Sequence, residues 1–512
     1  MNHPRRLLGI TASLRSARRG VAEESLLTEL ASIENLEQLL EWIGQQSRMH
    51  LEQFLEAGRR EGKPFEEIYR NLQKLPGNKG LSNSEAALAA ALWAARQDGT
   101  AIGHLSLSDH FKVSGKVREP DLLRRRLLES DGILLSGPVY FGDRSSLAES
   151  LVDFIARDET LRQSMEGRLF GAISVGAKRN GGQETTLIYQ MLDMMALGFL
   201  AVGNDSDTTA QYGGTCHAGD VGTIHKDRYG IDTSMGVGRR MSHVLDYLHH
   251  DHRLKAGEAP RVLFLILQDA DGIGLAQAER LTTRLAGIAA CSILDLSSRE
   301  IHRCIACDIC PTHVDLDEIY RCIIHGRGDA LESLHEGLLH HDMLVPVTVT
   351  LRDRSRVRSN YQSFMERTRY LRRGDYLWSD LVVAPLSFTD HPGEDLLPVR
   401  MITSLIRHHT VVTHPSVVTL GAGGEPDLTL ALQRLNLAVR TAARLTAGRL
   451  AATSANNLRY NPVGYILSAH KSLEDERHAL RQRMVDERKA QLQREAERRL
   501  DRAPDRDQDA SA

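Results

Sequence analysis

Short apolar runs that alternate with helix-like segments constrain this chain more than any other feature. The runs at 6–10 (RLLGI), 132–136 (GILLS) and 170–175 (FGAISV) are each followed by a polar or glycine-rich loop and then by helical periodicity. Continuous apolar strands separated by helices indicate a parallel sheet with helices on both faces. We therefore expect an α/β, doubly wound fold, whose ligands bind beyond the carboxyl ends of the strands.

The second half of the chain repeats this plan. Three further apolar runs lie at 262–267, 344–349 and 381–385. Asp131 precedes Phe154 by 23 residues and Asp342 precedes Phe364 by 22 residues, and in both cases a strand start is joined to the following helix. Repeated spacing of this kind predicts a duplication, with two doubly wound domains in tandem.

The expected domain boundaries follow from composition. We predict a first domain over 1–255 with a helical insertion at about 21–76, because apolar residues recur at helical spacing there until the turn PGNKG. A second, degenerate domain is expected over 256–471. Residues 472–512 mix positive and negative charges, which is typical of a solvated helix followed by a disordered tail.

Charge and hydropathy exclude several classes of partner. The 64 Lys and Arg against 67 Asp and Glu leave a net charge of −3, which argues against nucleic-acid wrapping and against a polybasic membrane surface. No apolar run is long enough to cross a bilayer, and Leu7–Ile10 is too short for a signal-peptide core. We expect a cytoplasmic protein with reduced cysteines, no nucleic-acid partner and no membrane association.

The loop after the first strand offers groups that suit a phosphate. Ser13 and Arg15 lie in TASLR, and Ser82, Asn83 and Ser84 stand at the start of the helix that follows the insertion. Backbone N–H groups, hydroxyls, a guanidinium and a helix N-terminus together suit a phosphate monoester. The alternative for these segments is a surface loop and an ordinary helix cap.

Two further loops follow predicted parallel strands. The loop at 137–142 (GPVYFG) carries a proline-stiffened backbone and two aromatic rings, and the loop at 176–185 (GAKRNGGQET) carries paired glycines and an amide. The first could instead plug the end of the sheet, and the second could be a mobile loop. Since all three loops should meet at one edge of the sheet, we predict a single pocket with a phosphate end and a flat aromatic end.

These motifs, with YGG at 212–214, resemble the NADPH-dependent FMN reductase and multimeric flavodoxin superfamily. The resemblance implies a flavodoxin-like fold, non-covalently bound FMN and NAD(P)H as electron donor. It implies phosphate contacts from Ser13, Arg15, Ser82, Asn83 and Ser84. It implies ring contacts from Pro138, Val139, Tyr140, Phe141, Gly142, Gly181, Gly182, Gln183 and Glu184, and it also assigns Tyr212 to cofactor binding. The chain departs from the family because the insertion splits its phosphate loop, and no catalytic side chain is assigned.

Four cysteines form a compact group with the spacing of a metal site. Two residues separate Cys304 from Cys307 and Cys307 from Cys310, and eleven residues separate Cys310 from Cys322. Such thiolates can bind an iron–sulfur cluster, and the run resembles the motif of iron–sulfur flavoproteins in the same superfamily, which implies a [4Fe–4S] cluster. The alternatives are zinc, with His313 as a further ligand, and free or redox-switching thiols.

The leading hypothesis is an FMN-dependent oxidoreductase with FMN in the first half and a cluster in the second. Electrons would pass between the halves of this intrachain pseudo-dimer to a small-molecule or protein acceptor, and the protein could assemble as a homo-oligomer. The alternative is a non-enzymatic electron-transfer or scaffold protein with flavodoxin-like halves. A nucleotide- or phosphate-metabolising enzyme is disfavoured because the sequence has no P-loop.

Overall fold

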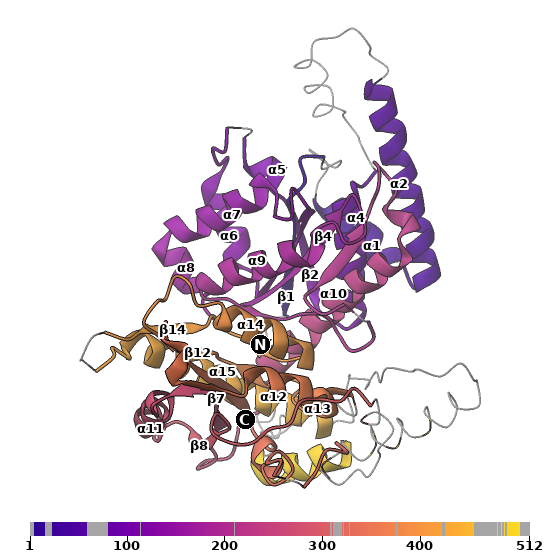
Figure 1. Ribbon diagram of the computed structural model, residues 1–512. Helices are drawn as coiled ribbons and strands as arrows, with labels where there is room; N and C mark the ends of the chain where they lie inside the picture. The colour runs from indigo at the N-terminus through magenta and orange to yellow at the C-terminus, as the bar shows by residue number, and fades with distance from the viewer. Residues whose placement is uncertain are drawn as a thin grey trace, which may run out of the picture. The chain divides into compact units, whose positions relative to one another are not determined.

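The computed structural model of the chain (Figure 1) divides into two compact units, an N-terminal unit over Met1–Leu245 and a C-terminal unit over Asp246–Ala512. Within the part of the chain that the structure describes, no helix is both long and apolar enough to cross a membrane. The described residues are 5–15, 23–58, 80–112, 114–208, 210–307, 310, 320, 322–326, 328–373, 377–421, 425–454, 479, 483, 486 and 489–501.

The N-terminal unit is built on a parallel sheet with the strand order β2-β1-β3-β4-β5. This is the order of flavodoxin-like folds, so the expected doubly wound plan is confirmed for this unit. A further strand, β6, pairs with β4 beyond β5. The strands are β1 (Arg6–Thr11), β2 (Ala101–Ser106), β3 (Gly132–Pro138), β4 (Leu169–Gly176), β5 (Leu200–Ala201) and β6 (Gly214–His217).

Helices cover this sheet, most of them with one apolar stripe toward it, whereas α4 is buried all round. The most deeply packed is α4, whose residues from Ser84 to Ala95 are all buried. An alanine-rich sequence lets this helix approach the strands closely. The helices of the N-terminal unit after the insertion are α4 (Asn83–Gln97), α5 (Leu107–His110), α6 (Pro120–Leu128), α7 (Ser146–Arg157), α8 (Glu159–Met165), α9 (Gln183–Ala196), η1 (Ile224–Lys226) and α10 (Arg228–Leu248).

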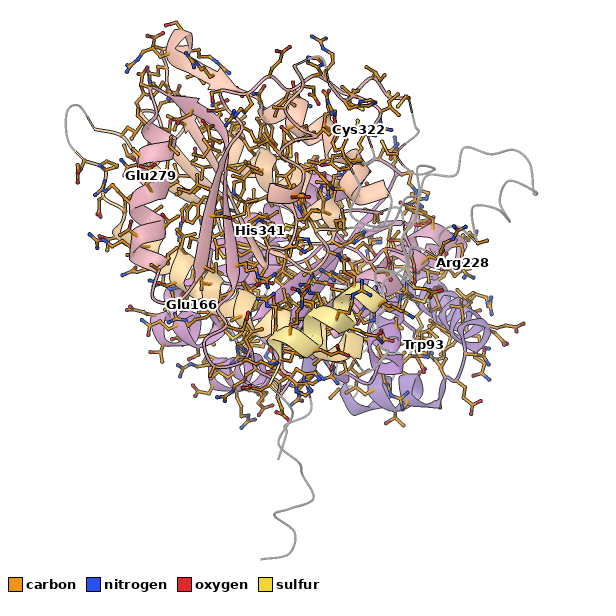
Figure 2. The ribbon with its side chains drawn as sticks, turned by 90° about the horizontal axis from the view of Figure 1, so that it is seen from below. Trp93, Glu166, Arg228, Glu279, Cys322 and His341 are labelled. Carbon is orange, nitrogen blue, oxygen red and sulfur yellow. The ribbon has the colours of Figure 1, made fainter. Side chains whose placement is uncertain are left out.

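The expected insertion contains two described helices, α1 (Glu23–Ser32) and α2 (Leu36–Gly58). Residues 59–79 lie outside the described residues. The indole of Trp93 on α4, labelled in Figure 2, donates a hydrogen bond of 2.9 Å to the carbonyl of Ile33 between these helices. The insertion is therefore joined to the core helix of the unit.

The C-terminal unit has a mostly parallel sheet with the strand order β8-β7-β9-β11-β13. The short β10 runs antiparallel to the end of β7, and β12 continues the sheet between β9 and β14. Its strands are β7 (Arg261–Ala270), β8 (Ala290–Asp295), β9 (Met343–Thr350), β10 (Val357–Ser359), β11 (Val382–Val383), β12 (Leu386–Thr389), β13 (Val411–Val412) and β14 (Ser416–Thr419). Its helices are α11 (Ile273–Leu285), η2 (Glu336–Leu338), η3 (Arg354–Arg356), α12 (Tyr361–Arg367), α13 (Arg369–Arg373), α14 (Leu397–Leu405), η4 (Ile406–His408) and α15 (Thr429–Ser454).

The charged C-terminal segment differs from the expected solvated helix. Residues 489–499 are helical, and one face of this helix is buried. Leu492 packs against Leu450, and the guanidinium of Arg499 donates to both carboxylate oxygens of Asp342 at 3.0 and 2.6 Å. Burial of Leu492 and Ala496 anchors a helix whose composition is otherwise polar, and the carboxylate of Asp342 compensates the buried charge of Arg499.

Candidate functional site

Segments far apart in the sequence line one pocket of about 390 Å³ in the N-terminal unit. The pocket lies beyond the carboxyl ends of β1 and β3, where a doubly wound fold binds its ligands. The predicted residues that line it are Ser13, Arg15, Ser82, Asn83, Ser84, Pro138, Val139 and Tyr140. The structure thus brings the two halves of the interrupted phosphate loop together with the aromatic loop.

The loop after β1 is held in place by buried hydroxyl groups. The N–H of Ala12 donates to the carbonyl of Ser136 at 2.8 Å, and the hydroxyl of Ser145 donates to the carbonyl of Ala12 at 2.7 Å. Further along the same loop, the N–H of Arg15 donates to the hydroxyl of Ser13 at 3.2 Å. These bonds keep the backbone of the loop turned toward the pocket, where it can meet an anion.

The start of α4 forms the adjacent wall. Ser82 caps the helix, with its own N–H donating to Glu85 at 2.9 Å while its hydroxyl accepts from the N–H of Glu85. Asn83 accepts from the N–H of Ile224 and donates to the carbonyl of Asp220. The N–H groups of Asn83 and Ser84 have no acceptor one turn earlier in the helix. They can therefore donate to an anion, and the helix dipole favours negative charge at this end of α4.

The aromatic loop ends in a tight turn. The backbones of Tyr140 and Asp143 exchange hydrogen bonds of 2.8 and 3.0 Å, and Phe141 and Gly142 between them have positive φ angles of 52° and 82°. This geometry leaves the ring of Phe141 fully exposed at the tip, while Tyr140 lines the pocket with 53% of its surface exposed. Phe141 and Gly142 are absent from the pocket lining, so their predicted ring contacts stay predictions.

The glycine loop touches the aromatic loop but lines a second pocket. Gly182 has φ 100°, and a Cβ at this position would lie 2.6 Å from the Cα of Gly142. Only glycine fits such a conformation and such a close approach. Gly182, Gln183 and Glu184 line a neighbouring pocket of about 480 Å³ together with Arg179. Gly181 precedes them in the same loop and lines neither pocket.

The amide of Gln183 shapes its own loop. Its Nε2 donates to the carbonyls of Lys178 at 2.7 Å and Cys216 at 3.1 Å, and its Oε1 accepts from the N–H of Gly181 at 2.7 Å. These bonds use both amide protons and one lone pair of the oxygen. The family resemblance places this amide against the flavin ring, whereas in the structure it forms hydrogen bonds with backbone groups. Glu184, one residue later, is exposed in the first turn of α9.

Tyr212 is not among the residues that line the two pockets. Its side chain is partly buried against the apolar core of the N-terminal unit, and the following glycines lead into β6. The cofactor contact expected from Tyr212 therefore stays a prediction.

Residues of the insertion line the pocket, which sequence reasoning missed. His50 and Phe54 on α2 and the segment 218–221 contribute to it. His50 is 7% exposed, and burial, followed by the nearby Arg15, lowers its pKa to about 4. The available signal was its position, because His50 lies seven residues after the buried Ile43, on the buried face of α2 that also carries Gln46 and Ser47.

The cysteine group is only partly described. Cys310 and Cys322 are buried, Cys304 is half-buried and Cys307 is exposed, while 308–309, 311–319 and 321 lie outside the described residues. His313, the further ligand of the zinc alternative, falls in the same gap. No group of three or more His, Cys, Asp and Glu side chains able to hold a metal ion occurs among the described positions. Figure 2 labels Cys322 in the C-terminal unit.

A buried arginine holds the segment that carries these cysteines. The guanidinium of Arg367 on α12 donates to Asp329 at 2.9 and 3.1 Å, to the carbonyl of His302 at 3.0 Å and to that of Ile324 at 3.1 Å. It also donates to the hydroxyl of Tyr320. Because these acceptors flank the cysteines, Arg367 fixes the segment to α12 from both sides.

Comparison with known proteins identifies relatives of part of this chain. Residues 77–207 match the NADPH-dependent FMN reductase family. An iron–sulfur flavoprotein of Methanocaldococcus jannaschii is 33% identical over 178 residues, which make up 32% of this chain and 90% of that protein. An NAD(P)H dehydrogenase (quinone) of Caulobacter vibrioides is 27% identical over 151 residues, which make up 27% of this chain and 74% of that protein.

A solved structure is also similar in part. The flavodoxin-like, WrbA-like protein from Agrobacterium tumefaciens is 18% identical, covers 32% of this chain and 88% of its own, and has a TM-score of 0.24. Together with the sequence relatives, the family match favours an enzyme over the non-enzymatic scaffold that the sequence left open.

Proposed function

Because this chain belongs to the NADPH-dependent FMN reductase family of flavin-dependent NAD(P)H oxidoreductases, we propose that its N-terminal unit binds FMN in the pocket of about 390 Å³. The observation that carries the proposal is the convergence of Ser13, Ser84 and Tyr140 on that pocket. Its volume lies within the range of small-molecule sites. When bound, FMN accepts hydride from NAD(P)H and passes one or two electrons to a small-molecule or protein acceptor.

The residues of the pocket divide into a polar and an aromatic end. The N–H groups at the start of α4 and the loop after β1 would hold the phosphate, since a helix N-terminus with free N–H groups binds such an anion. Tyr140 and Val139 would border the ring system and exclude water from one side. Gly182 would keep the neighbouring loop close to this wall.

A charge placed at the phosphate end tests this assignment. Ser84→Asp puts a carboxylate into the first turn of α4, where it repels a phosphate, and leaves the Ser82 cap intact. Ser146→Asp makes the same change at an exposed position in the first turn of α7, outside the pocket lining, and circular dichroism of Ser84→Asp checks that its buried site still folds. We expect the wild type and Ser146→Asp to bind FMN, and NADPH or NADH to bleach its absorbance under anaerobic conditions.

Two results would contradict the proposal. One is a wild-type chain that binds no FMN or holds FMN that neither NADPH nor NADH reduces. The other is Ser84→Asp binding FMN as tightly as Ser146→Asp, which would place the phosphate elsewhere.

A duplication of the flavodoxin-like plan in the C-terminal unit is supported by matching details. Its strand order β8-β7-β9-β11-β13 runs in the same sense as β2-β1-β3-β4-β5 of the N-terminal unit. The N–H of Arg6 donates to Asp131 at 2.8 Å, and the N–H of Arg261 donates to Asp342 at 2.8 Å. Both carboxylates directly precede the strand that pairs with the first strand of their unit.

In the C-terminal unit, a carboxylate occupies the place between the first strand and the following helix that corresponds to the phosphate end of the N-terminal pocket. Asp269, at the end of β7, accepts from the N–H groups of Gly274 at 2.7 Å and Leu275 at 3.2 Å at the start of α11, the helix that Glu279 marks in Figure 2. A side-chain carboxylate at this place repels a phosphate. We therefore expect one FMN per chain, and a titration that saturates at two would contradict this.

The finer proposal, an iron–sulfur cluster that receives electrons in the C-terminal unit, rests on the cysteine spacing and on the printed name of the Methanocaldococcus relative. It is tested by quantifying iron and acid-labile sulfide in protein purified without oxygen. Cys322→Ser is the informative variant, with the isolated Cys291→Ser as its control. Absence of both elements from the wild type would contradict the cluster and leave the flavin site unaffected.

A further inference from the structure

The insertion places a histidine at the pocket, with one ring nitrogen that no described residue hydrogen-bonds. His50 on α2 is 7% exposed, and its Nδ1 has no partner among the residues that the structure describes. The side chain lines the pocket together with Phe54, one turn further along the same helix. Protein atoms cover Nδ1, so a ligand in the pocket can meet the ring only through the side that lines the pocket, and a polar group of the ligand can form a hydrogen bond there.

The position of His50 is fixed by a close backbone approach. A Cβ at Gly80 would lie 2.4 Å from the backbone nitrogen of His50, so α2 touches the segment that leads into α4. The N–H of Leu81 also donates to the carbonyl of Gln46 on α2 at 3.4 Å. His50 therefore faces the pocket from a rigid helix, beside the capped start of α4.

Arg15 supplies a positive charge beside His50 at this end of the pocket. The guanidinium of Arg15 lies 5.4 Å from the centre of the Phe54 ring, and its charge acts on His50. The other charged residue of the lining is Asp220, whose carboxylate already accepts from the N–H of Val221 at 2.7 Å. With its pKa lowered to about 4, His50 is neutral at pH 7 and carries one N–H to donate.

We propose that the insertion completes the anion end of the pocket, with His50 hydrogen-bonding a phosphate monoester beside Arg15, so that the site selects phosphorylated over unphosphorylated flavin. The identity of the ligand as a flavin rests on the proposed function, whereas the anion site itself rests on His50, Arg15 and the start of α4. The helical insertion is then part of the binding site.

Comparison of two flavins tests the selectivity. Protein freed of cofactor is titrated with FMN and with riboflavin, and binding is followed by quenching of flavin fluorescence. We expect His50→Leu to weaken FMN binding by about 10- to 100-fold and riboflavin binding by less than about 2-fold. His50→Gln, which can still donate, should retain most of the FMN affinity. Glu52→Gln, an exposed change on α2, is the control.

Equal weakening of both flavins by His50→Leu, or no weakening of FMN, would overturn the inference. Circular dichroism of each variant separates these outcomes from misfolding, and His50→Gln remains informative if His50→Leu does not fold.

Inorganic phosphate provides a readout that is independent of flavin. The ring carbon of His50 is observed by NMR of histidine-labelled protein and assigned by its loss in His50→Gln. We expect phosphate, but not chloride at equal ionic strength, to raise the pKa of His50 from about 4 toward its ordinary value. A response to phosphate in a chain that binds no flavin would refute the flavin function alone. No response to either phosphate or FMN would refute the anion site.

Discussion

Replacement of Arg367 by methionine tests how the cysteine segment is held in the C-terminal unit. The side chains of Arg367 and Asp329 are both fully buried, and their closest ion-pair distance is 2.9 Å. Arg367→Met leaves the Asp329 carboxylate with the N–H of His302 but without its guanidinium. Removing one partner of a buried ion pair costs about 3–5 kcal/mol, because the remaining charge is uncompensated. We expect the free energy of unfolding of this unit to fall by about that amount.

The unfolding is followed with a single tryptophan. The chain has three tryptophans, and replacing Trp42 and Trp93 with phenylalanine leaves the buried Trp378 as the reporter of the C-terminal unit in urea. Thiol modification of metal-free protein gives a local measure of the same change. Exposed thiols such as that of Cys307 react first in the wild type, whereas Arg367→Met should accelerate the reaction of the buried Cys322.

A second substitution separates charge from packing. Arg367→Met combined with Asp329→Asn removes both charges and keeps an oxygen that can accept from the N–H of His302. We expect the double variant to recover about half of the lost stability. Unchanged unfolding and unchanged thiol kinetics in Arg367→Met would refute the clamp, and a double variant as unstable as the single one would refute the role of the uncompensated charge.

Three further predictions follow from single positions. Gly182→Ala should lower the free energy of unfolding by about 1–3 kcal/mol, because its Cβ would meet the Cα of Gly142 at 2.6 Å. An unchanged melting temperature in thermal unfolding would contradict this close contact between the two loops. Asp269→Ala should cost about 1 kcal/mol, because the first turn of α11 loses its acceptor, whereas a stabilised variant would contradict this reading. Burial lowers the pKa values of His50 and His414 to about 4. Their contribution to the free energy of unfolding is therefore fully present above about pH 6.5, and it is lost toward pH 4 because the unfolded chain takes up protons first. Each histidine should contribute a loss of about 2 kcal/mol by pH 5, and urea unfolding of His50→Gln and His414→Gln should show a flatter pH dependence than the wild type.

Much of the fold was predictable because its signals are local. The apolar run at 132–136 became β3, and the pair Ser82 and Glu85 became the capping box of α4. Both depend on residues within one strand or one helical turn, where neighbours in the sequence are also neighbours in space. The parallel order of the strands followed from the alternation of strands with helices.

Parts of the candidate site were not predictable from the sequence. Gln183 has the chemistry to face a heterocycle, yet its amide bonds to the backbone at Lys178, Cys216 and Gly181. Which partner a long polar side chain takes depends on groups that are distant in the sequence. The burial of Arg499 against Asp342, 157 residues away, escaped the sequence for the same reason.

The sequence by itself determined the doubly wound plan of the N-terminal unit, the capped start of α4 and the loops at the carboxyl ends of its strands, because periodicity and capping act over a few residues. Only the tertiary structure decided that His50 and Phe54 of the insertion line the same pocket as Ser13 and Tyr140. Contacts between distant segments are set by the packing of whole helices against a sheet, and that packing has no signature in any one stretch of the chain.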